Sequence, residues 1–134
     1  MHIGVNTLFL IPGEVGGSET YLCRTLEAIA TGYPSARITL FTNNENDAVL
    51  RNRFEGFRQI GCQRILCTAS RRSERILKEQ FLLPSRVKMS GADILWSPGY
   101  TACIFSPVPQ VVSILDMQYK SFPEDLTPPA RFVT

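Results

Sequence analysis

The stretch PGEVGGSETY, residues 12–21, joins an apolar segment to an amphipathic one through a pair of glycines. The segment before it, residues 3–11, has the nearly continuous apolar character of a buried parallel strand. After it, Leu22, Leu26 and Ile29 recur at helical spacing, so one face of a helix can pack against a sheet. The stretch therefore predicts the start of an α/β domain.

The glycine pair makes this turn a candidate phosphate or sugar site. Gly16 and Gly17 lack a Cβ, so the backbone can approach a ligand closely. With Ser18 as the expected N-cap, the free N–H groups of the first helical turn would point at a bound anion. Neither G-x-G-x-x-G nor the P-loop pattern is present. A turn that merely closes a strand onto a helix therefore stays open as the alternative.

Strand-like and helix-like segments alternate along the rest of the chain. The expected strands are 36–42, one or two within 57–68, 93–96 and 110–115. The expected helices are 45–54 and a basic amphipathic helix at 71–82, after which Pro84 restarts a short one. This order predicts a parallel sheet with right-handed crossovers and helices on both faces.

Ligands of such sheets bind beyond the carboxyl ends of the strands. That edge would gather the Gly16–Gly17 turn, Asn43 and Asn44, residues 97–100, and residues 116–120. The agreement of these segments indicates a binding site there more strongly than any one motif does.

Composition limits the possible functions. A chain of 134 residues with 44% hydrophobic residues fits one globular domain. A net charge of +2 is too small to indicate a nucleic-acid partner. No run approaches the roughly 20 apolar residues that span a membrane, and the first 11 residues lack the basic start of a secretory signal. The expected location is the cytoplasm, or the inner face of the membrane.

The cysteines do not follow a metal-binding or disulfide pattern. Cys23, Cys62, Cys67 and Cys103 have no C-x-x-C spacing, and His2 is the one histidine. We expect no metal site, and we expect the thiols to be small buried hydrophobes.

Three segments together resemble a known family. They are the Gly16-Gly17-Ser18-Glu19 turn with its flanking strand and helix, FLLPSRVKMSGADILWSPGY, and PVPQVVSILDMQYKSFPEDL. In this order they are similar to the N-terminal domain of retaining glycosyltransferases of family 4, which have the GT-B fold. The resemblance implies one half of a GT-B architecture: a single Rossmann-like domain over residues 1–134 that binds the acceptor, facing a second domain that binds the nucleotide-sugar.

The resemblance also implies roles for individual residues. Gly16 and Gly17 would contact the donor diphosphate and the transferred sugar through their backbone. Glu19, Ser97 and Tyr100 would line the acceptor side. Asp116 would be the catalytic carboxylate that orients or deprotonates an acceptor hydroxyl; a cap for nearby backbone N–H groups is the alternative.

The chain departs from the family pattern in two places. Leu115 stands where many relatives have a histidine before the aspartate. The donor-binding domain, with its glutamates spaced eight apart, is absent, and we expect the chain to be truncated at its C-terminal end. No cofactor or metal is expected beyond the nucleotide-sugar co-substrate, and the chain alone should show little or no transferase activity.

Two further features have open alternatives. Trp96 could stack on a sugar or belong to the core. The basic helical region could contact anionic lipid, or it could be an ordinary solvated face. Its cations are Arg71, Arg72, Arg75, Lys78, Arg86 and Lys88.

The function expected from these observations is the acceptor-side domain of a retaining glycosyltransferase. Its acceptor would be a saccharide or a lipid-linked saccharide. A non-catalytic sugar-binding or assembly module that kept the scaffold is the alternative, and a different nucleotide-binding α/β domain is a third.

Overall fold

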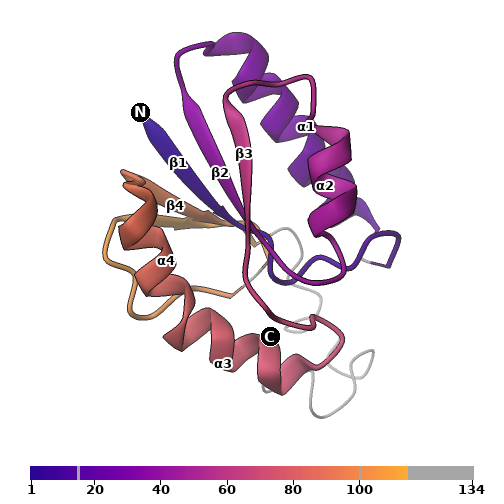
Figure 1. The fold of residues 1–134 in the computed structure, drawn as a ribbon, viewed down its shortest axis with the longest axis vertical. Coiled ribbons are helices and arrows are strands. Elements are labelled where there is room, and N and C mark those ends of the chain that lie inside the picture. Colours follow the sequence, from indigo (N-terminus) through magenta and orange to yellow (C-terminus); the bar gives the residue numbers. More distant parts are fainter. Residues whose placement is uncertain (15, 100, 115–134) are drawn as a thin grey trace.

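The strand β1, His2–Asn6, lies at the centre of a five-stranded parallel sheet. In the computed structural model, which describes residues 1–14, 16–99 and 101–114, β1 pairs with β2, Arg37–Thr42, and with β4, Ile94–Ser97. The strands β3, Ile60–Arg64, and β5, Gln110–Val112, complete the order β3-β2-β1-β4-β5 (Figure 1). The predicted Rossmann-like α/β fold is therefore confirmed.

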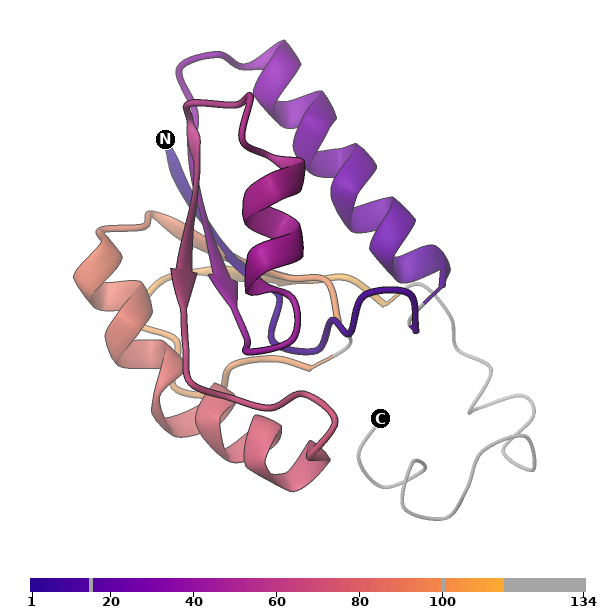
Figure 2. The same cartoon turned by 45° about the vertical axis from the view of Figure 1, so that its right-hand side comes forward.

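Helices cover both faces of the sheet, as Figure 2 shows. On one face lie α1, Gly17–Gly32, and α2, Asp47–Arg53. On the other lie α3, Arg72–Phe81, and α4, Leu83–Ser90. This arrangement follows from the alternation of strands and helices in the sequence, because each crossover must bury its apolar stripe against the sheet.

Each face has its own hydrophobic core. Val5, Ile38 and Trp96 pack with Leu22 and Leu26 of α1 in the first core. The neighbouring strand positions, such as Phe41 and Leu95, pack with Leu83 and Val87 of α4 in the second. Side chains alternate between the faces of a strand, so Asn6 and Ser97, the last residues of β1 and β4, point to the same face as α3 and α4.

The first strand is shorter than expected, because it ends at Asn6 rather than Ile11. The Asn6 side-chain oxygen accepts a hydrogen bond from the Leu8 N–H, and the Leu10 N–H donates to the Thr7 carbonyl. These bonds turn the chain away from the sheet. Leu8 and Leu10 are nevertheless fully buried, which explains why the segment resembles one long strand.

The expected helix boundaries are partly correct. α1 ends at Gly32, before Tyr33 and Pro34, as predicted, and Pro84 lies in the first turn of α4. The expectation that Ser18 caps α1 is wrong, since Ser18 lies inside the helix and Gly16 is its N-cap. Glycine takes that position because its φ is 58° and its ψ is −125°, a conformation unfavourable for any residue with a Cβ.

The buried face of α3 differs from a normal amphipathic face. Its two buried residues are Arg75 and Glu79, whereas Leu77 and Phe81 have 58% and 70% of their surface exposed. Arg75 is therefore buried and does not belong to the expected basic surface. Periodicity alone could not show this, because the charged residues occupy the helical stripe that faces the sheet.

Candidate functional site

The β1–α1 loop brings its glycines to the carboxyl edge of the central strand. Gly13 and Gly16 both have positive φ, 81° and 58°. The Gly13 N–H donates to Glu19 Oε2 at 2.9 Å, so the carboxylate of the first helical turn closes the loop. Gly16 and Gly17 are exposed, and among the described residues no side chain caps the N-terminus of α1. The Glu19 N–H already donates to the Gly16 carbonyl at 3.2 Å, so the N–H groups of Gly17 and Ser18 are the ones available to an anion.

Two buried asparagines hold the first half of this loop. Asn43 Nδ2 donates to the carbonyls of Leu8 and Leu10, both at 3.0 Å. Asn46 Nδ2 donates to the carbonyls of Thr7 and Leu10, at 2.8 and 3.1 Å. Both asparagines are 0% exposed. The two side-chain amides therefore fix the conformation of the loop.

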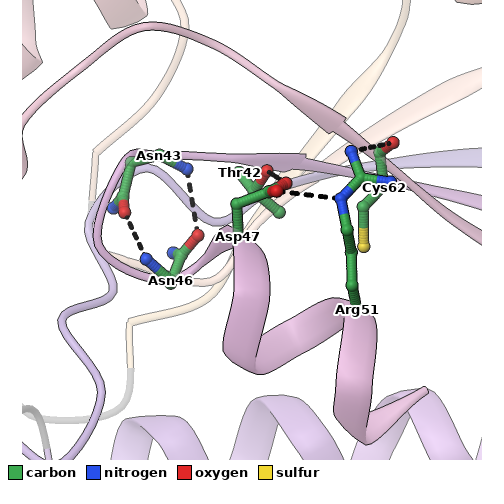
Figure 3. A network of polar contacts seen from close by, with 6 residues as sticks. All are labelled: Thr42, Asn43, Asn46, Asp47, Arg51 and Cys62. Atoms are coloured by element: carbon green, nitrogen blue, oxygen red, sulfur yellow. Dashed lines mark hydrogen bonds and ion pairs between the residues drawn. The ribbon is translucent and has the colours of Figure 1, made fainter. Parts of the chain in front are cut away.

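The same asparagines bind each other's backbone at the start of α2 (Figure 3). The Asn43 N–H donates to Asn46 Oδ1 at 2.9 Å, and the Asn46 N–H donates to Asn43 Oδ1 at 2.8 Å. The sequence predicts Asn43 at the ligand-binding edge, but in the structure its side chain binds the loop and the start of α2. The sequence feature that indicates this role is the Asn-x-x-Asn spacing before a helix. Its neighbour Asn44 is exposed.

A second polar network, also shown in Figure 3, connects α2 to β2 and β3. The Thr42 hydroxyl donates to Asp47 Oδ1, and Arg51 Nε donates to Asp47 Oδ2 at 2.8 Å. Arg51 also donates to the Cys62 carbonyl at 3.0 Å. Burial alone would raise the pKa of Asp47, but the bonds from Arg51 and Thr42 outweigh it and hold that pKa below its ordinary value.

Buried charge lies on the opposite face, below the carboxyl end of β1. Glu79 is 1% exposed, and its Oε1 accepts a hydrogen bond from Asn6 Nδ2 at 3.0 Å. Burial raises the pKa of Glu79, while the charge of Arg75 and the side chains of Thr101 and Asn6 act in the opposite direction. Burial likewise lowers the pKa of Arg75. The sequence predicts Arg75 and Glu79 on a surface helix of mixed charge and indicates no site role for Glu79.

The loops after β1 and β4 meet where the strand order reverses, which is the usual ligand position of an open parallel sheet. Phe9 packs against Gly99 so closely that a Cβ on Gly99 would lie 2.4 Å from the phenyl ring. Trp96 is buried, and its indole N–H donates to Ser113 Oγ at 2.8 Å. This burial supports its place in the core rather than a sugar-stacking role.

The predicted site residues have different positions in the structure. Gly16, Gly17 and Glu19 lie together in the loop at the start of α1. Ser97 ends β4 and is 1% exposed. Tyr100 and Asp116 lie outside the described residues, as does Leu115.

The cysteines have free thiols, as expected, and three of the four are buried. Burial raises the pKa of Cys62 and of Cys103 to about 11, which keeps both thiols protonated at neutral pH. Within residues 1–14, 16–99 and 101–114, no cluster of side chains could hold a metal ion. None of the helices in the described part of the chain is long and apolar enough to cross a membrane.

The fold and this edge define a Rossmann-like α/β domain with a ligand-accessible helix N-terminus. Comparison of the chain with protein-family models, with curated proteins and with solved structures gives no match. The geometry of the edge and the resemblance of the sequence segments are therefore the basis for the functional proposal.

Proposed function

We propose that this chain is the acceptor-side domain of a retaining glycosyltransferase with the GT-B architecture. The observation that carries the proposal is the uncapped N-terminus of α1 beside Gly16 and Gly17, at the carboxyl edge of the central strand. The parallel sheet, the glycine turn and the three family-like sequence segments support it together. The acceptor is a saccharide or a lipid-linked saccharide.

The chemistry needs stabilisation of negative charge on the departing nucleotide diphosphate. Oriented N–H groups at a helix N-terminus supply this without a metal. The exposed backbone of Gly16 and Gly17 suits a close approach of the diphosphate and the transferred sugar. Glu19 lies in the same turn, where its carboxylate accepts from Gly13 and has further lone pairs for a sugar hydroxyl.

Transfer also requires a second, donor-binding domain facing this edge, because two domains must close to exclude water from the reactive sugar. The proposal therefore assigns acceptor binding to this chain and turnover only to its combination with such a domain. Asp116 remains the proposed catalytic carboxylate, and Tyr100 and Ser97 the proposed acceptor contacts.

An apolar surface on α3 supports contact with a membrane-bound acceptor. Leu77, Phe81, Ile104 and Phe105 are all more than half exposed, and the rings of Phe81 and Phe105 are 6.0 Å apart. Lys78 follows Leu77, and Lys88 is exposed on α4. Exposed apolar side chains with nearby cations favour the surface of anionic lipid over the cytosol.

Isotope-labelled NMR spectra of the chain test the acceptor assignment. We expect methyl glycosides to shift the amide signals of Glu19 and Ser97, which line the acceptor side, and free uridine diphosphate to leave these two signals unchanged. Binding of the nucleotide but not of any glycoside would instead favour a nucleotide-binding domain. Shifts by neither ligand would favour an assembly module, the alternative that Leu115 supports because leucine cannot hydrogen-bond a sugar.

Cosedimentation with phosphatidylserine vesicles tests the membrane contact separately. We expect binding that is lost in high salt and reduced by the double replacement Leu77→Ser and Phe81→Ser. The matched control is Val49→Ser, an exposed apolar residue of α2 on the opposite face. Equal binding by all three proteins would contradict the proposed surface.

A further inference from the structure

Besides Gln63 Oε1 on β3, three buried polar side-chain atoms have no hydrogen-bond partner among the described residues. They are Arg75 at Nε, Glu79 at Oε2 and Ser97 at Oγ. Only 9% of the surface of Arg75, and 1% of the surface of Glu79 and of Ser97, is exposed to solvent. Buried polar atoms in proteins are nearly always paired, so three unpaired ones in one region need an explanation.

The topology places the three residues in one region. Asn6 and Ser97 end neighbouring strands, since Val5 is opposite Trp96 in the β1–β4 register. Both point to the face that α3 covers, and Asn6 contacts Glu79 directly. Arg75 lies near Glu79, because the charge of each residue shifts the pKa of the other.

A structural ion pair does not explain these residues. Arg75 and Glu79 are four positions apart on α3, the spacing at which opposite charges pair, yet none of the ion pairs among the described residues joins them. A buried carboxylate and a buried guanidinium that leave donor and acceptor atoms free destabilise the fold. Functional sites are one place where proteins keep such groups, because a bound ligand can complete their hydrogen bonds.

We propose that Arg75 and Glu79 bind adjacent hydroxyl groups of the acceptor saccharide, with Ser97 as a third contact. This inference rests on the proposed function and names the residues that select the acceptor. Arg75 Nε donates to one hydroxyl oxygen and Glu79 Oε2 accepts from a second hydroxyl. A neutral polyol fits better than an ion of either sign, because the carboxyl repels an anion and the guanidinium repels a cation.

The test uses the whole chain, a series of methyl hexopyranosides as probes, and the variants Arg75→Met and Glu79→Gln. Glutamine keeps an acceptor for Asn6 but removes the free carboxylate oxygen, and methionine fills the space of the arginine stem without its donors. The matched controls are Arg72→Met and Glu74→Gln on the same helix, where Arg72 is exposed and Glu74 half-buried. Affinity is measured by NMR titration and stability by thermal unfolding.

We expect Arg75→Met and Glu79→Gln to weaken glycoside binding about tenfold or more, and Glu79→Gln to do so with thermal stability unchanged or higher. The two controls should bind as the wild type does. Wild-type affinity in Arg75→Met and Glu79→Gln would overturn this site and leave the acceptor-domain proposal standing. Lower stability with unchanged affinity would show a purely structural cluster, and failure of the wild type to bind any glycoside would overturn both proposals.

Discussion

Asn6 Nδ2 donates to Glu79 Oε1 across 3.0 Å, and so joins the last residue of the central strand to a helix 73 positions later in the chain. The bond satisfies one carboxyl oxygen of Glu79. The other oxygen has no direct hydrogen-bond partner among the described residues, and the nearby Thr101 side chain lowers the pKa of the carboxyl. This half-satisfied carboxyl makes the stability of the domain sensitive to pH.

We expect Glu79 to destabilise the folded domain increasingly as the pH rises. Its pKa is raised by burial above the ordinary value of 4.5, so the folded state holds a proton that the unfolded state releases. The stabilising contribution is complete below pH 4.5 and is lost as the pH passes through the raised pKa. Chemical denaturation from pH 4 upward, in wild type and in Glu79→Gln, measures the effect.

The difference between the two proteins isolates the one carboxyl. The unfolding free energy of the wild type should fall relative to that of Glu79→Gln by up to about 1.4 kcal/mol per pH unit within the titration range. The charged neighbour Arg75 and the Cys103 thiol, which bonds to the Glu79 backbone carbonyl, are present in both proteins and cancel in first order. A difference that does not vary with pH would contradict the prediction.

Replacing Asn46 with alanine should destabilise the domain by about 2–4 kcal/mol, because buried carbonyls and an N–H lose their partners. Asn46 bonds to Thr7, Leu10 and Asn43, all from within the core. The control is Asn44→Ala, which removes a single exposed contact of 3.5 Å to Thr68 and should change stability by less than about 0.5 kcal/mol. Equal effects in urea unfolding would show that the buried asparagines do not hold the loop.

Gly99→Ala should destabilise the domain by about 1–3 kcal/mol, since its new methyl group would overlap the Phe9 ring. The double variant with Phe9→Leu should recover part of that loss, because a smaller side chain leaves room for the methyl group. A double-mutant cycle measures this coupling. Additive effects would mean that the two loops do not touch in solution.

The two glycines of the turn should respond in opposite ways to alanine. Gly16→Ala should lower stability by about 1–3 kcal/mol, because an L-residue is strained at a φ of 58° and a ψ of −125°. Gly17 is the first helical residue with open space around it, so Gly17→Ala should be neutral or stabilising by up to about 1 kcal/mol. Equal thermal midpoints would argue against the backbone geometry of the loop.

The overall fold could be predicted from the sequence because it depends on regular patterns. Helix and strand boundaries are marked by local propensity, which does not depend on tertiary contacts. The signals here are the apolar runs, Gly32-Tyr33-Pro34 and Pro84. The first strand was overestimated because Leu8 and Leu10 are buried for tertiary reasons, and burial leaves the same hydrophobic signal as a strand.

The candidate site was less accessible to this kind of reasoning. Gly16 and Gly17 could be predicted because glycine, which lacks a Cβ, marks turns and close approaches of the backbone. Arg75 and Glu79 could not, because their importance comes from contact with Asn6 and from burial beneath the sheet. A charged pair on a helix is normally a solvated face, and only the packing of α3 shows that these two residues point inward.

The asparagine pair Asn43 and Asn46 recognises the β1–α1 loop only through backbone carbonyls. Every amino acid carries the same carbonyl, so other apolar side chains at positions 8 and 10 could meet the same two amides. Relatives of this protein can therefore diverge widely in the loop while an Asn-x-x-Asn step after the second strand preserves its path. That step is a signature by which distant relatives could be found when their side chains no longer resemble one another.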